Sequence, residues 1–105
     1  MEYELVQFEI PKDAKIIWNS FFYDAPIQWR LQDLFAIKFA NGDVLDMGWY
    51  PDSDKNGEYY ALIVDQEDWD KPPLDEFETK DCNLMKQWIQ ERINERIYDL
   101  PERQS

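Results

Sequence analysis

Two apolar segments that flank an Asn-Gly pair constrain the fold of this chain more than any other feature of its sequence. Residues 34–39 and 44–50 are rich in aliphatic and aromatic side chains, and Asn41-Gly42 lies between them. Asn-Gly strongly favours the positive φ angles of a tight hairpin turn. This part of the sequence therefore predicts a β-hairpin.

The length of the hairpin loop decides which side chains share a face. A two-residue loop at Asn41-Gly42 would place Ile37 opposite Asp46, which would mix apolar and charged side chains. A three-residue loop, residues 40–42 with Gly42 in a left-handed conformation, shifts the pairing by one residue. One face then holds Phe35, Ile37, Leu45, Met47 and Trp49. The other face holds Ala36, Lys38, Val44 and Asp46. We expect the three-residue loop because it makes one face wholly apolar.

Further strands are predicted on both sides of the hairpin. On the N-terminal side, the expected extended segments are residues 3–10, 15–18, 21–23 and 27–31. On the C-terminal side, residues 58–65 show little polar alternation and predict an interior strand, while residues 74–79 alternate and predict an edge strand. Polar residues at 51–57 and 66–73 are expected to connect these strands.

A long C-terminal helix is predicted after residue 80. Asp81 is a favourable N-cap, and Pro101 predicts a helix end at about Asp99. Apolar side chains recur at steps of three and four residues and form one stripe: Leu84, Met85, Trp88, Ile89, Ile93, Ile97 and Leu100. We expect a single α+β domain over residues 1–105. Its antiparallel β-meander sheet (about 3–79) would be packed against one long C-terminal helix (about 82–99).

The composition argues against several kinds of functional site. The chain has no histidine and one cysteine, Cys82, so a histidine-activated nucleophile or a zinc site lacks the residues it needs. Residues 52–57 match the start of a calcium-binding loop, but the twelfth position is Ile63 instead of a bidentate acid. We therefore expect a protein that is not an enzyme and uses no cofactor or metal. A single cysteine and the lack of a long apolar run favour a cytoplasmic location.

Acidic residues are concentrated in the second half of the chain. Between Asp52 and Asp81 there are eleven carboxylates and three lysines, a net charge of −8, against −12 for all 105 residues. Such charge repels nucleic acid and anionic lipid and favours a basic protein partner. The sequence predicts partner-binding residues in this segment: Asp52, Asp54, Glu67, Asp68, Trp69, Asp70, Asp75 and Glu76. A solvated acidic loop that only promotes solubility is the open alternative.

Trp69 differs from the other tryptophans in its surroundings. It lies within an acidic loop, where exposure of an indole is costly, so we expect an anchor or a partner contact. The remaining tryptophans fall in extended or helical patterns and are expected in the core: Trp18, Trp29, Trp49 and Trp88.

Three short segments give the chain a resemblance to a known class of proteins. They are Asp46-Met47-Gly48-Trp49-Tyr50-Pro51, Tyr59-Tyr60, and the stretch from Asp68-Trp69-Asp70 to Phe77-Glu78-Thr79. Over residues 34–97 the chain resembles small bacterial immunity proteins of contact-dependent growth inhibition and related polymorphic toxin systems. The resemblance implies a cytosolic protein that binds one cognate toxin domain, commonly a nuclease, and blocks its active site. These families share no common binding residues, so the resemblance adds none.

Charge and resemblance together predict an immunity protein that neutralises a basic toxin domain, with a ribonuclease as the expected class. A nucleic-acid mimic, like a phage anti-restriction or anti-CRISPR protein, is the alternative. It would use the same charges against a DNA-binding enzyme. A carboxylate hydrolase is the third possibility, and it requires a concave site with two acids about 5–10 Å apart, one with a raised pKa.

Overall fold

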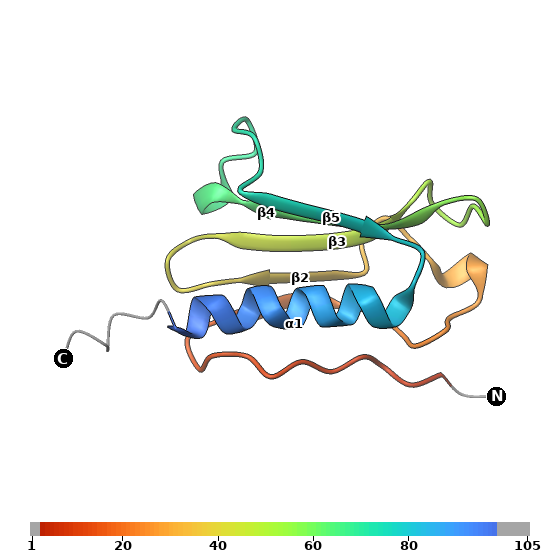
Figure 1. The fold of residues 1–105 in the computed structure, drawn as a ribbon, viewed down its shortest axis with the longest axis horizontal. Helices are drawn as coiled ribbons and strands as arrows, with labels where there is room; N and C mark the ends of the chain where they lie inside the picture. Colours follow the sequence, from red (N-terminus) through yellow and green to blue (C-terminus); the bar gives the residue numbers. More distant parts are fainter. Residues whose placement is uncertain (1–2, 99–105) are drawn as a thin grey trace.

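The computed structural model describes residues 3–98 and shows a five-stranded sheet with one helix packed on it (Figure 1). The strands are β1 (Lys15–Asn19), β2 (Phe35–Lys38), β3 (Val44–Tyr50), β4 (Glu58–Val64) and β5 (Asp75–Thr79). The helices are the short η1 (Ile27–Trp29) and η2 (Asp65–Glu67) and the long α1 (Cys82–Tyr98). Neighbouring strands are antiparallel and follow the sequence order. The predicted α+β meander is therefore confirmed.

The β2–β3 hairpin has the predicted three-residue loop. Phe39 N donates a hydrogen bond to Asp43 O at 2.9 Å, which closes a loop of residues 40–42, and Gly42 has a φ of +97°. Ile37 pairs with Leu45, as the apolar alternation requires. The loop length is therefore confirmed, and it places the large apolar side chains of both strands on the side covered by α1.

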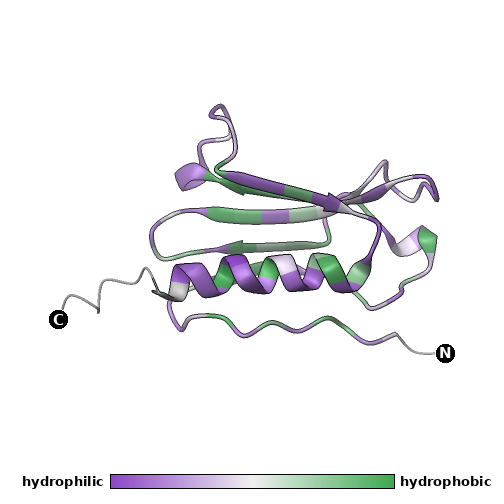
Figure 2. Cartoon of the chain, in the orientation of Figure 1, coloured by the Kyte–Doolittle hydropathy of each residue, from purple (hydrophilic) through white to green (hydrophobic). Residues whose placement is uncertain are grey.

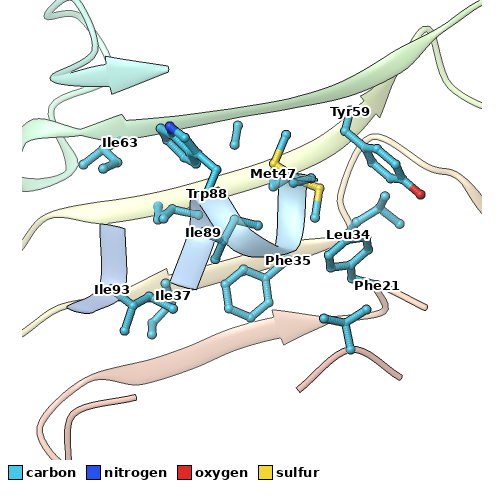
Figure 3. Close-up of a cluster of buried hydrophobic side chains, with 14 of the residues drawn as sticks. Phe21, Leu34, Phe35, Ile37, Met47, Tyr59, Ile63, Trp88, Ile89 and Ile93 are labelled. Atoms are coloured by element: carbon cyan, nitrogen blue, oxygen red, sulfur yellow. The ribbon is translucent and has the colours of Figure 1, made fainter. Parts of the chain in front are cut away.

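The hydrophobic core lies between this face of the sheet and α1 (Figure 3). Met85, Ile89 and Ile93 of α1 are fully buried, and Trp88 stacks on Phe77 of β5 with ring centroids 5.6 Å apart. Figure 2 shows hydrophobic residues along β2, β3 and β4, whereas β5 and the loop before it are mostly hydrophilic. The sheet is thus covered on one side.

The start of α1 is also as predicted. The Asp81 carboxylate accepts hydrogen bonds from Asn83 N and Leu84 N, at 2.8 and 3.1 Å, which satisfies two free donors of the first turn. The predicted apolar stripe is wrong at Leu84, whose side chain is 48% exposed. The predicted end of the helix at Asp99, and Leu100 in the stripe, lie outside the described residues.

Residues 3–10 do not form a strand of the sheet, contrary to the prediction. The segment is extended, runs beside α1 (Figure 1), and forms an isolated bridge between Leu5 and Phe22. Gln90 of α1 bonds to the backbone of Glu9 in both directions, since its Oε1 accepts from Glu9 N at 3.0 Å and its Nε2 donates to Glu9 O at 2.9 Å. A helix side chain therefore satisfies backbone groups that a neighbouring strand would otherwise satisfy.

Residues 27–31 were also expected to be extended, and this prediction is wrong. They begin with η1, in which Trp29 N donates to Pro26 O at 2.9 Å. Proline has a fixed φ that suits the start of a helical turn, and Pro26 has a φ of −62°. Trp29 is exposed at this turn instead of lying in the core.

Gly48 in β3 permits a close backbone approach. Residues 31–34, just before β2, lie against β3. Trp49 N of β3 donates to Leu31 O at 2.8 Å. A Cβ at Gly48 would lie 1.7 Å from Gln32 O, which is far inside any permitted contact. The backbone of Gln32 thus closes one end of the sheet surface that α1 does not cover.

We predict that Gly48→Ala will destabilise the fold by about 3 kcal/mol, because the added methyl group meets backbone that cannot move alone. The matched control is Gly42→Ala, where the φ angle is unfavourable but the nearest atom to a Cβ is 3.6 Å away. Its expected cost is about 1–2 kcal/mol. Urea unfolding of both variants checks this, and a smaller loss for Gly48→Ala than for Gly42→Ala would contradict it.

Candidate protein-binding surface

The side of the sheet opposite α1 carries the candidate functional surface, which we call the open face. One row of paired residues crosses all five strands: Trp18, Ala36, Asp46, Leu62 and Glu76. Farther along the same face, toward the β3–β4 turn, lie Tyr50 of β3, Tyr60 of β4 and Glu78 of β5. The open face therefore combines aromatic and aliphatic side chains with carboxylates on the strands of one sheet.

Trp18 is the largest exposed apolar side chain of the row, with 53% of its surface exposed. Its indole Nε1 donates to Ser20 Oγ and to the backbone O of Asp33, both at 3.0 Å. These bonds fix the ring from its polar edge. An indole that is fixed and exposed loses little entropy when a partner packs on it.

A concave pocket of about 320 Å³ lies beside Trp18 on the open face. Its lining residues are Ile17, Trp18, Asp33, Phe35, Ala36 and Asp46. The wall is mainly apolar, with two carboxylates. Within the described part of the chain, neither Asp33 nor Asp46 forms a salt bridge.

Asp46 is the half-buried carboxylate of this pocket. Burial, and then repulsion from Asp33, raise the pKa of its carboxyl above the usual value of 3.8, although a bond from Met47 N opposes the shift. A charge that is partly removed from water and faces a like charge is unfavourable. Asp46 therefore stands at a position where a cation from outside would be stabilising.

Tyr60 and Glu76 form the second polar feature of the open face. The Tyr60 hydroxyl donates to Glu76 Oε1, and this bond is the main reason that the pKa of Tyr60 is raised, to about 12. Tyr60 also packs edge-on against Tyr50, with ring centroids 6.1 Å apart. The two tyrosines and Glu76 thus hold each other in fixed positions.

The predicted binding residues Asp52 and Asp54 lie far from the rest of the predicted set. They belong to the β3–β4 turn, where Asp54 Oδ1 accepts from Asn56 N at 2.8 Å and Asp54 O accepts from Trp49 Nε1 at 2.7 Å. The seven residues of β4 separate this turn from Glu67, a distance of about 23 Å. The structure does not bring these two groups together.

The predicted residues Glu67, Asp68, Trp69 and Asp70 lie in η2 and the loop that follows, which projects beyond the sheet (Figure 1). Glu67 forms an ion pair with Lys38, at 2.7 Å. Asp68 is half-buried and accepts from Asp70 N at 3.1 Å. Trp69 is 59% exposed, so it is not an anchor within the described fold.

Asp75 and Glu76 are neighbours in sequence but point to opposite sides of β5. Asp75 pairs with the buried Ile63 in the register and forms an ion pair with Arg92 of α1 at 3.3 Å. Glu76 pairs with Leu62 and lies on the open face. Of the predicted binding residues, only Glu76 lies on the open face. Glu67 lies outside it but forms an ion pair with Lys38, which is on the same side of β2 as Ala36.

Sequence reasoning missed most residues of the open face. Trp18 was expected in the core and is exposed, whereas Trp49 and Trp88 are buried as predicted. The hairpin alternation did place Asp46 with Ala36 on the uncovered side. That signal could have identified the surface, because an acid in the middle of an interior strand is costly unless it has a role.

Comparison with known proteins assigns this chain to no family. The chain matches no family model, and comparison with curated proteins and with solved structures finds no match. Within residues 3–98, histidine, cysteine and carboxylate side chains form no group of three or more that could hold a metal ion. No helix in that range is long and apolar enough to cross a membrane.

We predict that Asp46→Asn will be more stable than the natural chain at pH 7. The raised pKa means that the folded state holds a proton at pH values where the unfolded state has lost it, so ionisation above that pKa destabilises the fold. The advantage of the variant should shrink as the pH falls through the raised pKa and be smallest below pH 3.8.

Urea unfolding between pH 3 and pH 8 measures this difference. The exposed Asp33→Asn is the control, and it should lower the pKa of Asp46, as read from the carboxyl carbon signal in an NMR titration. An advantage of Asp46→Asn that stays constant over the whole pH range would contradict the assignment.

Proposed function

We propose that this chain is a stoichiometric inhibitor of the immunity-protein type, which binds a basic toxin domain through the open face. One observation carries the proposal: exposed aromatic side chains lie among carboxylates that form no salt bridge within the described part of the chain. The resemblance to bacterial immunity proteins supports the same class. The proposed location is the cytoplasm, where such a toxin would act.

The arrangement on the open face suits a protein–protein interface. Trp and Tyr side chains dominate the affinity of such interfaces when they lie near the centre and polar groups surround them. On the open face Trp18 and the Tyr50–Tyr60 pair provide the apolar contacts, while Asp33, Glu76 and Glu78 provide negative charge. A basic and partly apolar partner surface would complement both.

A ribonuclease is the expected class of toxin because its active site gathers lysine and arginine along the path of the phosphates. Carboxylates held on strands can occupy that path and exclude the substrate by competition. Complementary charge would also raise the association rate to about 10⁸ M⁻¹s⁻¹ at low salt. The loop with Asp68, Trp69 and Asp70 would contact the edge of the same partner.

A carboxylate hydrolase is a second candidate, and the pocket favours it specifically. Asp33 and Asp46 line one concave site, and the charge of Asp33 helps raise the pKa of Asp46. A glycosidase uses two carboxyl groups in one site, and the pKa of its general acid is raised. Hydrolysis of aryl glycosides that is lost in Asp46→Asn would establish this function instead of the inhibitor.

Charge reversal on the open face tests the inhibitor function. We predict that Asp33→Lys combined with Glu78→Lys will abolish protection when the chain is co-expressed with the product of the adjacent gene, tested as the toxin. Both residues are exposed and make no side-chain hydrogen bond or salt bridge in the described structure, so thermal melting should change little. Growth of the host and co-purification of the complex are the two measurements.

A charge-matched control separates the surface from the total charge. Asp13→Lys combined with Glu9→Lys makes the same change in net charge at two exposed acids before β1, outside the open face, and it should preserve protection. Asp68→Lys with Asp70→Lys should weaken protection less than the open-face variant. Full protection by the open-face variant would refute this surface, and failure of the natural chain to bind the toxin would refute the inhibitor function.

A further inference from the structure

The pocket beside Trp18 has the chemistry of a site for one positively charged side chain. Its wall offers an indole and the aliphatic side chains of Ile17 and Ala36, and two carboxylates lie at the same pocket. No lysine or arginine is among the lining residues, and the described chain gives these acids no ion pair. The pocket therefore has uncompensated negative charge beside an apolar surface.

Elsewhere in this fold, an indole beside a carboxylate is occupied by an arginine. Arg92 lies over the ring of Trp88 at 5.3 Å and forms an ion pair with Asp75 at 3.3 Å. Its guanidinium thus contacts an indole and a carboxylate at once. Arg30 repeats the contact with an indole alone, since it lies over Trp49 at 4.7 Å from the ring centroid. Trp18 with Asp33 and Asp46 forms the same kind of surroundings without an arginine.

We propose that this pocket receives one arginine side chain of the basic partner, with the guanidinium between Trp18 and the carboxylates of Asp33 and Asp46. This inference rests on the proposed function and identifies the partner by the group it must present. The open face then has a specific point of attachment, because the pocket accepts one side chain from a protruding part of the partner.

Arginine fits this pocket better than lysine for physical reasons. Its guanidinium is flat, is less strongly hydrated than an ammonium group, and can stack on an indole while its five N–H donors reach two carboxylates. Lysine offers a point charge that loses more hydration on entry. The pKa of Asp46, raised by burial and by Asp33, would fall again when a cation neutralises this repulsion.

The test is an NMR titration of the full chain with N-acetyl-arginine amide, using N-acetyl-lysine amide and N-acetyl-citrulline amide as probes of the same size class. We expect saturable shifts of the Trp18 indole N–H and of the Ala36 and Asp46 amides, with a dissociation constant of about 1–10 mM. The lysine probe should bind at least threefold more weakly. The citrulline probe, which has the shape without the charge, should not saturate.

Two variants with the same change in charge complete the test. Asp46→Asn should weaken binding of the arginine probe at least fivefold, whereas Asp13→Asn, at an exposed acid outside the pocket, should leave it unchanged. Shifts spread over the acidic surface, equal binding of lysine, or equal effects of the two variants would overturn the inference. The titration uses no toxin, so it can succeed while protection fails, and it can fail while protection depends on the open face.

Discussion

The register of the β2–β3 hairpin determines both the core and the functional surface of this protein. The three-residue loop, with Gly42 at a φ of +97°, sets Ile37 against Leu45 and Ala36 against Asp46. A slip of one residue would turn Asp46 toward the apolar core beneath α1, where burial of a carboxylate is costly. The same constraint that keeps the core apolar therefore places an acid at the centre of the open face.

Charge is divided between the two sides of the sheet. On the side covered by α1, Arg92 pairs with Asp75 and Arg96 pairs with the buried Asp43, at 3.3 and 3.2 Å. Asp43 also accepts from Gln66 N, so one carboxylate joins the hairpin, η2 and the helix. The acids of the pocket on the open face have no such partners among the described residues. The arginines of α1 thus support the fold, while the uncompensated charge faces outward.

The sequence predicted correctly those features that depend on residues close together in the chain. The alternation in the hairpin and the Asp81 cap gave the register and the start of α1 correctly, because each depends on a few adjacent positions. The pairing of β1 could not be predicted this way, since its register shifts between Ile16 and Trp18 and its partner strand lies beyond an irregular segment. Trp18 was expected in the core because it lies in an extended pattern, and such a pattern alone does not show which face of the sheet the side chain occupies. The acidic residues formed one group in the sequence, but β4 separates them into two groups in space.

The position of the carboxylates on strands explains why the open face could select a partner rather than attract any cation. Adjacent strands are about 4.8 Å apart, so Asp46 and Glu76, two strands apart in one row, are held at a spacing of about 10 Å. The Tyr60 hydroxyl restrains Glu76, and the bonds of Trp18 restrain its ring. Side chains that are already ordered lose little entropy on binding, and a fixed spacing penalises partners whose charges do not match it. The exposed loop of Trp69 lacks this strand geometry, which is why we place the selective contact on the sheet.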